Sequence, residues 1–249
     1  MIKALPKTEK IMSYNIYTDT LDKLLINSVD KIIINTINPH SYVSAEYDDF
    51  YKTALNQSNF LLPDGAGIVL AARLLNQKKL IRISGSDFHE YTLATLNSLH
   101  GSVFYMGSSN ETLKKIQSRL LSSYPNITID FYSPPYKSNF TKEESDLIID
   151  KINSFNPDVL FVGMTAPKQE KWLHEHKSNL NFKFASCIGA VFDFYAGTVT
   201  RPSKFWIDLH LEWFIRFIRE PRRLFKRNFI STPLFLMDLL LYKFNLKKD

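Results

Sequence analysis

Two polar segments in the first third of the chain contain residue types that could do chemistry. Thr36 and Asn38 end a β-branched run that begins at Lys31, and alternation along a strand would point both side chains the same way. Asp64 lies in Pro63-Asp-Gly-Ala-Gly67, where a second apolar run gives way to a helical pattern. A carboxylate there could act as a general base, bind a ribose or cap the helix, and Thr36 and Asn38 could equally cap a turn.

Two further segments occupy equivalent positions later in the chain. Gly107-Ser-Ser109 follows a strand pattern and opens a helix, where backbone N–H groups could hold a phosphate or simply form a turn. In Gly163-Met-Thr-Ala-Pro-Lys-Gln-Glu170, the last two residues fall in the first turn of a predicted helix. The helix dipole is enough to explain Glu170, whereas Gln169 has no such role and indicates a contact with a ligand.

The C-terminal fifth of the chain carries the charge. Residues 201–249 include 11 basic and 5 acidic residues, which accounts for the whole net charge of +6. Such asymmetry indicates an anionic partner, and several arginines together suit a diphosphate. Trp213 and Phe214 are interleaved with these arginines, a pattern that is typical of a membrane interface. A solvated basic helix face is the alternative reading.

Alternating strands and helices must position these segments. Strands are predicted at 31–36, 59–62, 102–106, 127–132, 158–162 and 182–188. Helices are predicted at 44–55, 68–75, 86–99, 111–121 and 167–176, with another opened by the capping box of Thr141 and Glu144. This alternation predicts an α/β domain with a largely parallel sheet, and we assign it to residues 1–200.

A helical appendage is predicted for residues 201–249. It contains an amphipathic stretch at 204–219, a basic segment at 222–227 and a last helix that Ser231 caps and that reaches about residue 244. That last helix is apolar nearly all round, so the body, lipid or another chain must cover it. No stretch reaches the roughly 18 clean apolar residues of a membrane span, and no signal peptide is apparent, so we predict a cytoplasmic chain.

Several common sites are missing from the sequence. There is no D-x-D triplet and no G-x-G-x-x-G, which counts against a metal-dependent nucleotide site and a nicotinamide-dependent oxidoreductase. The pI of about 9.2 suggests a nucleic-acid binder, but the basic residues share their segment with an apolar helix. The single cysteine, Cys187, excludes an internal disulfide and is expected to be a buried strand residue.

Taken together, these segments resemble the WecG/TagA/CpsF family of glycosyltransferases, and they follow one another in the family order. The matching pieces are Thr36-Ile-Asn38, Pro63-Asp-Gly-Ala-Gly67, Arg82-Ile-Ser-Gly-Ser-Asp87, Pro157-Asp-Val-Leu-Phe-Val-Gly163, Pro167-Lys-Gln-Glu170, Phe192-Asp193, Ala196-Gly197, Arg201-Pro202, Leu211-Glu-Trp213, Arg216 and Glu220-Pro-Arg-Arg223. Two departures are Gly163-Met-Thr165, usually Gly-Leu-Gly, and Arg201-Pro-Ser-Lys-Phe-Trp206, usually Arg-Ala-Pro-x-Trp; they leave the donor sugar open.

The resemblance implies an inverting transfer from a UDP-sugar to an undecaprenyl-diphosphate-linked sugar, without a metal or other cofactor. It implies a Rossmann-like core and an appendage that meets an anionic membrane at the inner face of the plasma membrane. By motif position, Asp64 is the expected general base, with Thr36, Asn38 and Gln169 beside it in the active site. The expected substrate-binding residues are Arg82, Gly85, Asp87, Gly107, Gly163, Pro167, Lys168, Glu170, Asp193, Arg216, Arg223 and Arg227. The last helix leaves a homo-oligomer possible, and a membrane-associated nucleotide-binding scaffold without catalysis is the alternative function.

Overall fold

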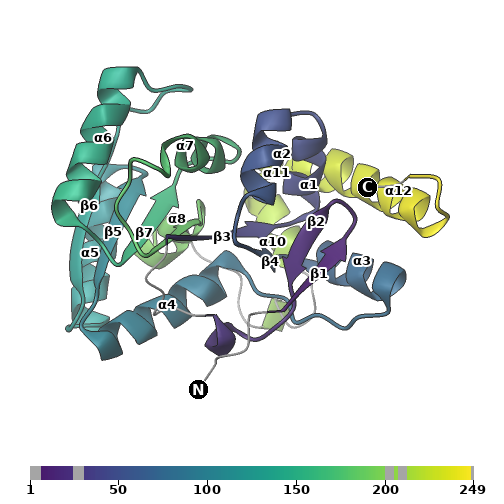
Figure 1. Ribbon diagram of the computed structural model, residues 1–249, viewed down its shortest axis with the longest axis horizontal. Coiled ribbons are helices and arrows are strands. Elements are labelled where there is room, and N and C mark those ends of the chain that lie inside the picture. Colours follow the sequence, from purple (N-terminus) through teal and green to yellow (C-terminus); the bar gives the residue numbers. More distant parts are fainter. Residues whose placement is uncertain (1–6, 25–30, 200–204, 207–211, 248–249) are drawn as a thin grey trace.

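One eight-stranded sheet runs through the molecule in the order β1-β2-β4-β3-β8-β7-β5-β6 (Figure 1). The computed structural model describes residues 7–24, 31–199, 205–206 and 212–247, without the side chains of Glu212, Arg216 and Arg223. The strands are β1 Thr8–Ile11, β2 Tyr14–Tyr17, β3 Ile32–Ile37, β4 Phe60–Pro63, β5 Ser102–Gly107, β6 Thr128–Tyr132, β7 Val159–Gly163 and β8 Phe184–Cys187. Among the described strands, only β1 and β2 pair in antiparallel fashion, so the predicted α/β class with a largely parallel sheet is confirmed.

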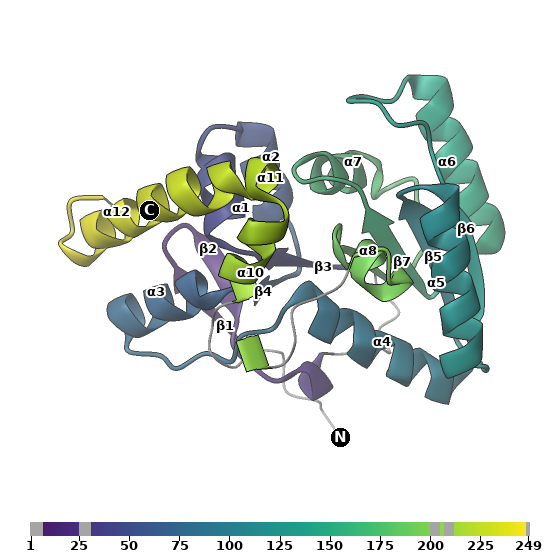
Figure 2. The same cartoon turned by 180° about the vertical axis from the view of Figure 1, so that it is seen from behind.

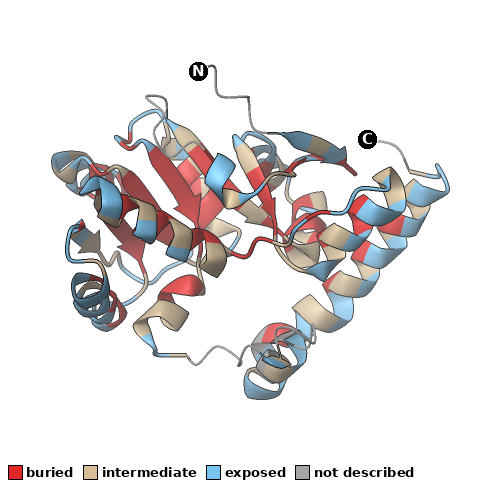
Figure 3. Ribbon diagram, turned by 90° about the horizontal axis from the view of Figure 1, so that it is seen from below, coloured by how far each residue is buried: buried red, intermediate tan, exposed pale blue. Residues whose placement is uncertain are grey.

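Helices pack on both faces of this sheet. They are η1 Leu21–Lys23, α1 Pro39–Glu46, α2 Asp49–Asn56, α3 Ala66–Asn76, α4 Gly85–Leu99, α5 Asn110–Ser123, α6 Lys142–Phe155, α7 Lys168–His176, α8 Val191–Ala196, α10 Glu212–Arg219, α11 Pro221–Phe225, the π-helical η2 Lys226–Ser231 and α12 Thr232–Lys243. Buried residues follow the strands, and the outer faces of the helices are exposed (Figure 3). This cover explains why the central strands read as continuous apolar runs rather than as alternating ones.

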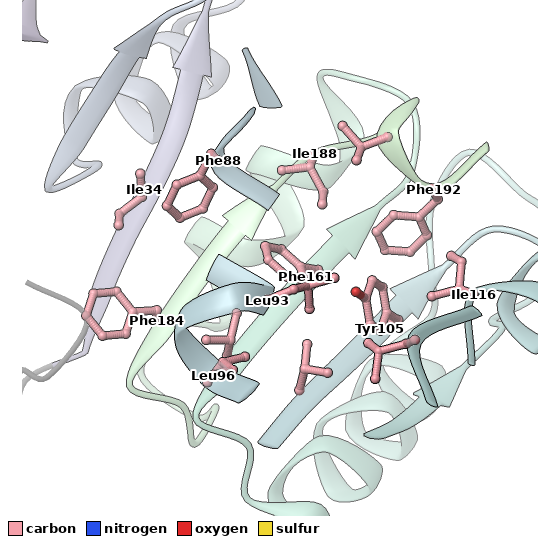
Figure 4. Packing of buried hydrophobic residues seen from close by; sticks show 14 of the residues in the cluster. Ile34, Phe88, Leu93, Leu96, Tyr105, Ile116, Phe161, Phe184, Ile188 and Phe192 are labelled. Atoms are coloured by element: carbon pink, nitrogen blue, oxygen red, sulfur yellow. The ribbon is translucent and has the colours of Figure 1, made fainter. Parts of the chain in front are cut away.

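Side-chain alternation along the strands divides the core into two layers. On one face, Tyr105 and Phe161 pack beneath α4, α5 and α8, which contribute Phe88, Ile116 and Phe192 (Figure 4). On the other face, residues of the same strands pack against α6 and α7. The central strands are therefore held from both sides, which fixes the positions of their carboxyl ends.

A third cluster covers the half of the sheet that contains the N-terminal hairpin. It joins β1 and β2 to α1, α2, α3 and the last helix, α12, which supplies Phe235 and Leu239. α12 lies beside α1 and α3 (Figures 1 and 2). On its opposite side, Leu236, Met237 and Leu240 are exposed. The body thus covers one face of the apolar helix, and no described helix is long and apolar enough to cross a bilayer.

The helix predicted at 44–55 is wrong, because two helices occupy this region. α1 ends before Tyr47, and Asp48 caps α2 by accepting a hydrogen bond at Oδ1 from the N–H of Tyr51, at 2.9 Å. A capping side chain competes with continuation of a helix, and apolar spacing alone does not reveal that competition. α1 begins at Pro39, five residues before the predicted start at residue 44, because Asn38 caps it.

The hairpin of β1 and β2 was not predicted. Each strand has four residues, and Met12 at the turn adopts a left-handed φ of 53° without the Asn-Gly or Asp-Gly signal that usually marks a tight hairpin. β2 pairs in parallel with β4, so tertiary contacts rather than local pattern define this edge of the sheet.

Candidate active site

A cavity of about 1330 Å³ lies at the carboxyl ends of the parallel strands. Its walls come from the ends of β3, β4, β5, β7 and β8, and from the loop that follows β6. The appendage closes part of it with Trp213, Leu224, Arg227 and Asn228. Open α/β sheets bind their ligands at this edge, and segments far apart in the sequence meet here.

The four residues expected to act in catalysis, Asp64, Thr36, Asn38 and Gln169, all line this cavity. The expected binding residues Arg82, Gly85, Gly107, Gly163, Pro167, Lys168, Glu170, Asp193 and Arg227 line it as well. Arg216 and Arg223 belong to α10 and α11, but their side chains lie outside the described residues.

Asp87 does not line the cavity. Its Oδ2 accepts hydrogen bonds from the Ser84 N–H, at 2.9 Å, and from the Ser84 hydroxyl, at 2.7 Å, which completes the capping box of α4. Asp87 therefore holds the turn that presents Ser84 and Gly85 to the cavity. Its role in the motif is to cap the start of α4.

Six helices begin at the rim of this cavity. The residues that precede α1, α3, α4, α5, α7 and α8 all line it, namely Asn38, Gly65, Ser84, Ser109, Pro167 and Ala190. The first turn of a helix carries the positive end of the helix dipole, and those of its N–H groups that no side chain caps can donate to a ligand. Their convergence makes the cavity a favourable place for an anionic group such as a diphosphate.

Asp64 leaves the end of β4 with its backbone N–H donating to the carbonyl of Ile37 on β3, at 2.9 Å. The sequence allowed Asp64 to be the cap of the following helix. In the structure Gly65, with a left-handed φ of 87°, occupies the cap position of α3 instead. Asn38 does cap a helix: its Oδ1 accepts from the N–H groups of His40 and Ser41, at 3.0 and 3.1 Å. Asn38 thus combines a structural role with a position on the cavity wall.

Two of the predicted glycines are required by close packing. Gly107 has a φ of 116°, and a Cβ there would lie 2.3 Å from the carbonyl oxygen of Gly163 on the neighbouring strand. A Cβ on Gly163 would lie 2.4 Å from the ring of Phe192. Both positions therefore exclude a side chain at the point where β5 and β7 reach the cavity.

Gln169 and Glu170 form a buried pair in the wall of the cavity. Gln169 Oε1 accepts from the Met164 N–H at 3.1 Å, and its Nε2 donates to Glu170 Oε1 at 2.8 Å. These two bonds fix the orientation of the amide. Burial raises the pKa of Glu170 to about 7, and its Oε2 has no hydrogen-bond partner in the described part of the chain. Glu170 lies in the first turn of α7, as predicted, and it is a buried carboxyl group.

Lys168 lines the cavity, but its ammonium group holds the neighbouring loop. Nζ donates to the carbonyl of Lys137 and lies 3.6 Å from the centre of the Phe140 ring. Burial and the charge of Lys137 lower the pKa of Lys168. Its observed contacts position the loop between β6 and α6, which forms one side of the cavity.

Sequence reasoning missed part of this wall. The loop from Ser133 to Phe140 lines the cavity, as do Gly189 after β8 and Asn228 in the appendage. The loop could have been found from its position, since it follows a predicted strand as the other site segments do. Cys187 is buried, as predicted, and also reaches the cavity. No group of three or more metal-ligating side chains was found among the described residues.

A largely parallel sheet whose strand ends and helix N-termini surround a cavity is the arrangement in which open α/β folds bind phosphorylated ligands. The family model described as the glycosyl transferase WecG/TagA/CpsF family matches residues 10–249. The chain belongs to this family, and it is a glycosyltransferase.

Curated relatives match the chain over most of its length. An N-acetylglucosaminyldiphosphoundecaprenol N-acetyl-beta-D-mannosaminyltransferase of Bacillus subtilis (strain 168) is 34% identical over 224 residues, covering 90% of this chain and 85% of the relative. An enzyme of the same name from Staphylococcus aureus (strain MW2) is 28% identical, covering 89% of this chain and 84% of the relative. The resemblance inferred from the motifs is thereby confirmed.

Proposed function

We propose that the enzyme transfers a sugar of the N-acetylmannosamine or hexose type from a UDP-sugar to a sugar linked to undecaprenyl diphosphate, with inversion at the anomeric carbon. The relatives' names give an N-acetylmannosaminyl group and an N-acetylglucosaminyldiphosphoundecaprenol acceptor. The observation that carries the proposal is the cavity, which collects Asp64, Thr36, Asn38 and Gln169 at the strand ends. Such products serve cell-surface polysaccharide synthesis.

Asp64 is the general base in this proposal. An acceptor hydroxyl oxygen forms a bond to the anomeric carbon while its proton passes to the Asp64 carboxylate. The bond from the anomeric carbon to the UDP oxygen breaks on the opposite face, and its electron pair leaves with UDP. Helix N-termini around the cavity stabilise the charge of the leaving group, a kind of electrostatic assistance that needs no reorganisation during the reaction.

The acceptor enters from the side of the appendage. Arg227 reaches the cavity there, and the guanidinium group suits a lipid-linked diphosphate. Arg216 and Arg223 are proposed to assist it, on the basis of their motif positions. More than half of the large apolar side chains that are exposed in the described part lie between Phe205 and Leu246, less than a fifth of the chain.

This apolar surface, together with the basic residues of the segment, supports docking on anionic lipid at the inner face of the plasma membrane. Roughly 1 kcal/mol per basic residue near such a surface is enough for salt-sensitive binding. The protein is expected to sediment with vesicles that contain anionic lipid and to leave them at high salt. Equal binding to neutral vesicles would contradict the electrostatic part of this proposal.

The decisive experiment is a UDP-release assay with a panel of UDP-sugars and a lipid-diphosphate-linked N-acetylglucosamine acceptor. Acceptor-dependent release with one donor, and a product of the corresponding mass, is the expected result. Failure with every donor, in folded and vesicle-bound protein, would point first to a different donor or acceptor and only then to the scaffold alternative.

A further inference from the structure

The hydroxyl of Ser231, which the sequence assigns to the cap of the last helix, is used elsewhere. The backbone of Ser231 is already helical, with φ −69° and ψ −39°, and its side chain makes no cap hydrogen bond. Its Oγ instead shares a hydrogen bond of 2.8 Å with Nδ1 of His40 in the body of the enzyme. Ser231 is buried and His40 is half-buried, so this bond is partly shielded from water.

His40 connects this bond to the active site. It is the second residue of α1, and its N–H donates to Oδ1 of Asn38, at 3.0 Å. On the other side of the bond, Ser231 ends η2, the π-helical turn that presents Arg227 and Asn228 to the cavity. The His40–Ser231 pair therefore joins two sides of the cavity. One side, the strand-end wall, is formed at the ends of the strands and includes Asn38, and the other, the appendage wall, is formed by the appendage and includes Arg227.

The packing around this bond is tight. A Cβ on Gly67 would lie 2.4 Å from Cγ of Pro39 and 3.3 Å from Cε1 of Phe235, so α1, α3 and α12 meet where only a glycine fits. The Tyr42 ring contacts Phe235 edge to face, with 5.3 Å between centroids. The second glycine of Pro63-Asp-Gly-Ala-Gly67 thus helps to seat the appendage beside the motif that contains Asp64.

The chemical state of His40 fits a neutral hydrogen-bonding role. Burial lowers the pKa of its imidazole, and the charges of Arg227 and Lys226 lower it further. Arg227 and Lys226 both belong to η2, and a small shift of η2 would move Arg227 relative to the cavity.

We infer that His40 and Ser231 are positioning residues for the acceptor: their hydrogen bond sets the place of Arg227 over the cavity and leaves the donor side unaffected. The inference rests on the proposed function, in which Arg227 binds the acceptor diphosphate. Neither residue touches the reacting atoms, and both act through the position of η2. The appendage is then a wall of the active site, and the His40–Ser231 bond is the contact that fixes η2 within it.

The test compares His40→Phe and Ser231→Ala with two controls in the full-length enzyme. His40→Phe keeps the ring and removes Nδ1, whereas His40→Asn places an amide near the same point and should restore the bond. Thr232→Ala is the matched control for Ser231→Ala, because the Thr232 hydroxyl donates to the Arg227 carbonyl within its own helical segment rather than to the body.

We expect His40→Phe and Ser231→Ala each to raise the KM for the lipid acceptor about three- to tenfold, the loss that one hydrogen bond allows. The Kd for UDP, measured by calorimetry, should not change. The double variant should be no worse than either single one, and His40→Asn should approach wild type. A wild-type acceptor KM in Ser231→Ala, or an equal rise in donor Kd, would overturn the inference.

Hydrogen exchange separates this inference from the proposed function. In Ser231→Ala, amides of residues 226–231 should exchange faster, while those of β5 and β7 keep their protection. If the wild-type enzyme transfers no sugar, the proposed function fails, yet the exchange result still decides whether the bond holds η2. Unchanged exchange in 226–231 would refute the inference even in an active enzyme.

Discussion

The two walls of the cavity are built by different means. The strand-end wall contains many glycines and serines, packed so closely at Gly107 and Gly163 that a methyl group does not fit. The appendage wall consists of larger side chains, including Trp213 and Arg227, on helices whose outer faces expose many apolar groups. The first wall is fixed by the core of the sheet, and the second by a few contacts between α12, η2 and α1.

This difference suggests a division of labour between the two substrates. A water-soluble nucleotide is held best by a rigid, preorganised set of N–H groups, because rigidity lowers the cost of binding. A lipid-linked acceptor must be received at a membrane surface, where apolar side chains and arginines are favoured. Changes in the strand-end wall should therefore affect chemistry and donor binding, and changes in the appendage should affect acceptor use.

Replacement of Asp64 by asparagine should have the largest effect on activity. Loss of a general base typically lowers kcat by about 10²–10⁴-fold, and the amide keeps the shape of the side chain. The measurement is single-turnover transfer, with UDP affinity and the unfolding curve as checks that the fold is intact. Asp87→Asn is the matched control, because this carboxylate caps α4 away from the cavity; it should lower stability and keep kcat. Wild-type turnover in Asp64→Asn would remove the role assigned to it.

The next prediction concerns how firmly the appendage is joined to the body. Phe235 is fully buried in the cluster that includes Tyr42, whereas Met237, two residues on, is 52% exposed. Phe235→Ala should reduce the free energy of unfolding by about 3–5 kcal/mol, because it leaves a cavity in a packed core. Met237→Ala should change it by less than about 0.5 kcal/mol. Urea unfolding measures both, and equal effects would show that α12 does not pack on the body as described.

Much of the strand-end wall could be predicted from the sequence, because its polar residues directly follow segments with a clear strand pattern. Asp64 and Gln169 follow apolar runs that read as strands, and parallel strands bring their carboxyl ends to one edge whatever the details of packing. The helix break at Asp48 and the hairpin at Met12 could not be predicted in this way, since a cap and a tertiary strand pairing determine them.

The appendage was harder to interpret for a related reason. Its composition indicates an apolar, basic surface, but a helix that is apolar nearly all round gives no sign of which face is covered. The buried faces of Phe235 and Leu239 depend on Gly67 and Tyr42, which are distant in sequence. The partner of Ser231 is equally non-local, and the local pattern pointed instead to a helix cap.

Glu170 offers a test of how deeply the strand-end wall is buried. Because burial raises its pKa to about 7, the native state keeps a proton that the unfolded chain releases from about pH 4.5 upward. Stability should therefore fall as pH rises from about 4.5 to 7, by about 3 kcal/mol in total, and level off above. Glu170→Gln should lack this slope. Urea unfolding at a series of pH values measures it, and parallel curves for the two proteins would contradict the assignment.

The smallest expected effect is that of a chelator on transfer. The sequence has no D-x-D triplet, and in the proposed mechanism the charge of the leaving UDP is met by helix N-termini of the strand-end wall. Full activity in EDTA is the expected outcome, measured with donor and acceptor both saturating. Restoration of a lost rate by Mg²⁺ would show that a metal supplies the charge instead. Arg227→Lys then tests whether the appendage takes part in the chemical step. A lower rate at saturating acceptor would mean that Arg227 stabilises the leaving group. A higher acceptor KM alone would confine the role of Arg227 to binding the lipid diphosphate.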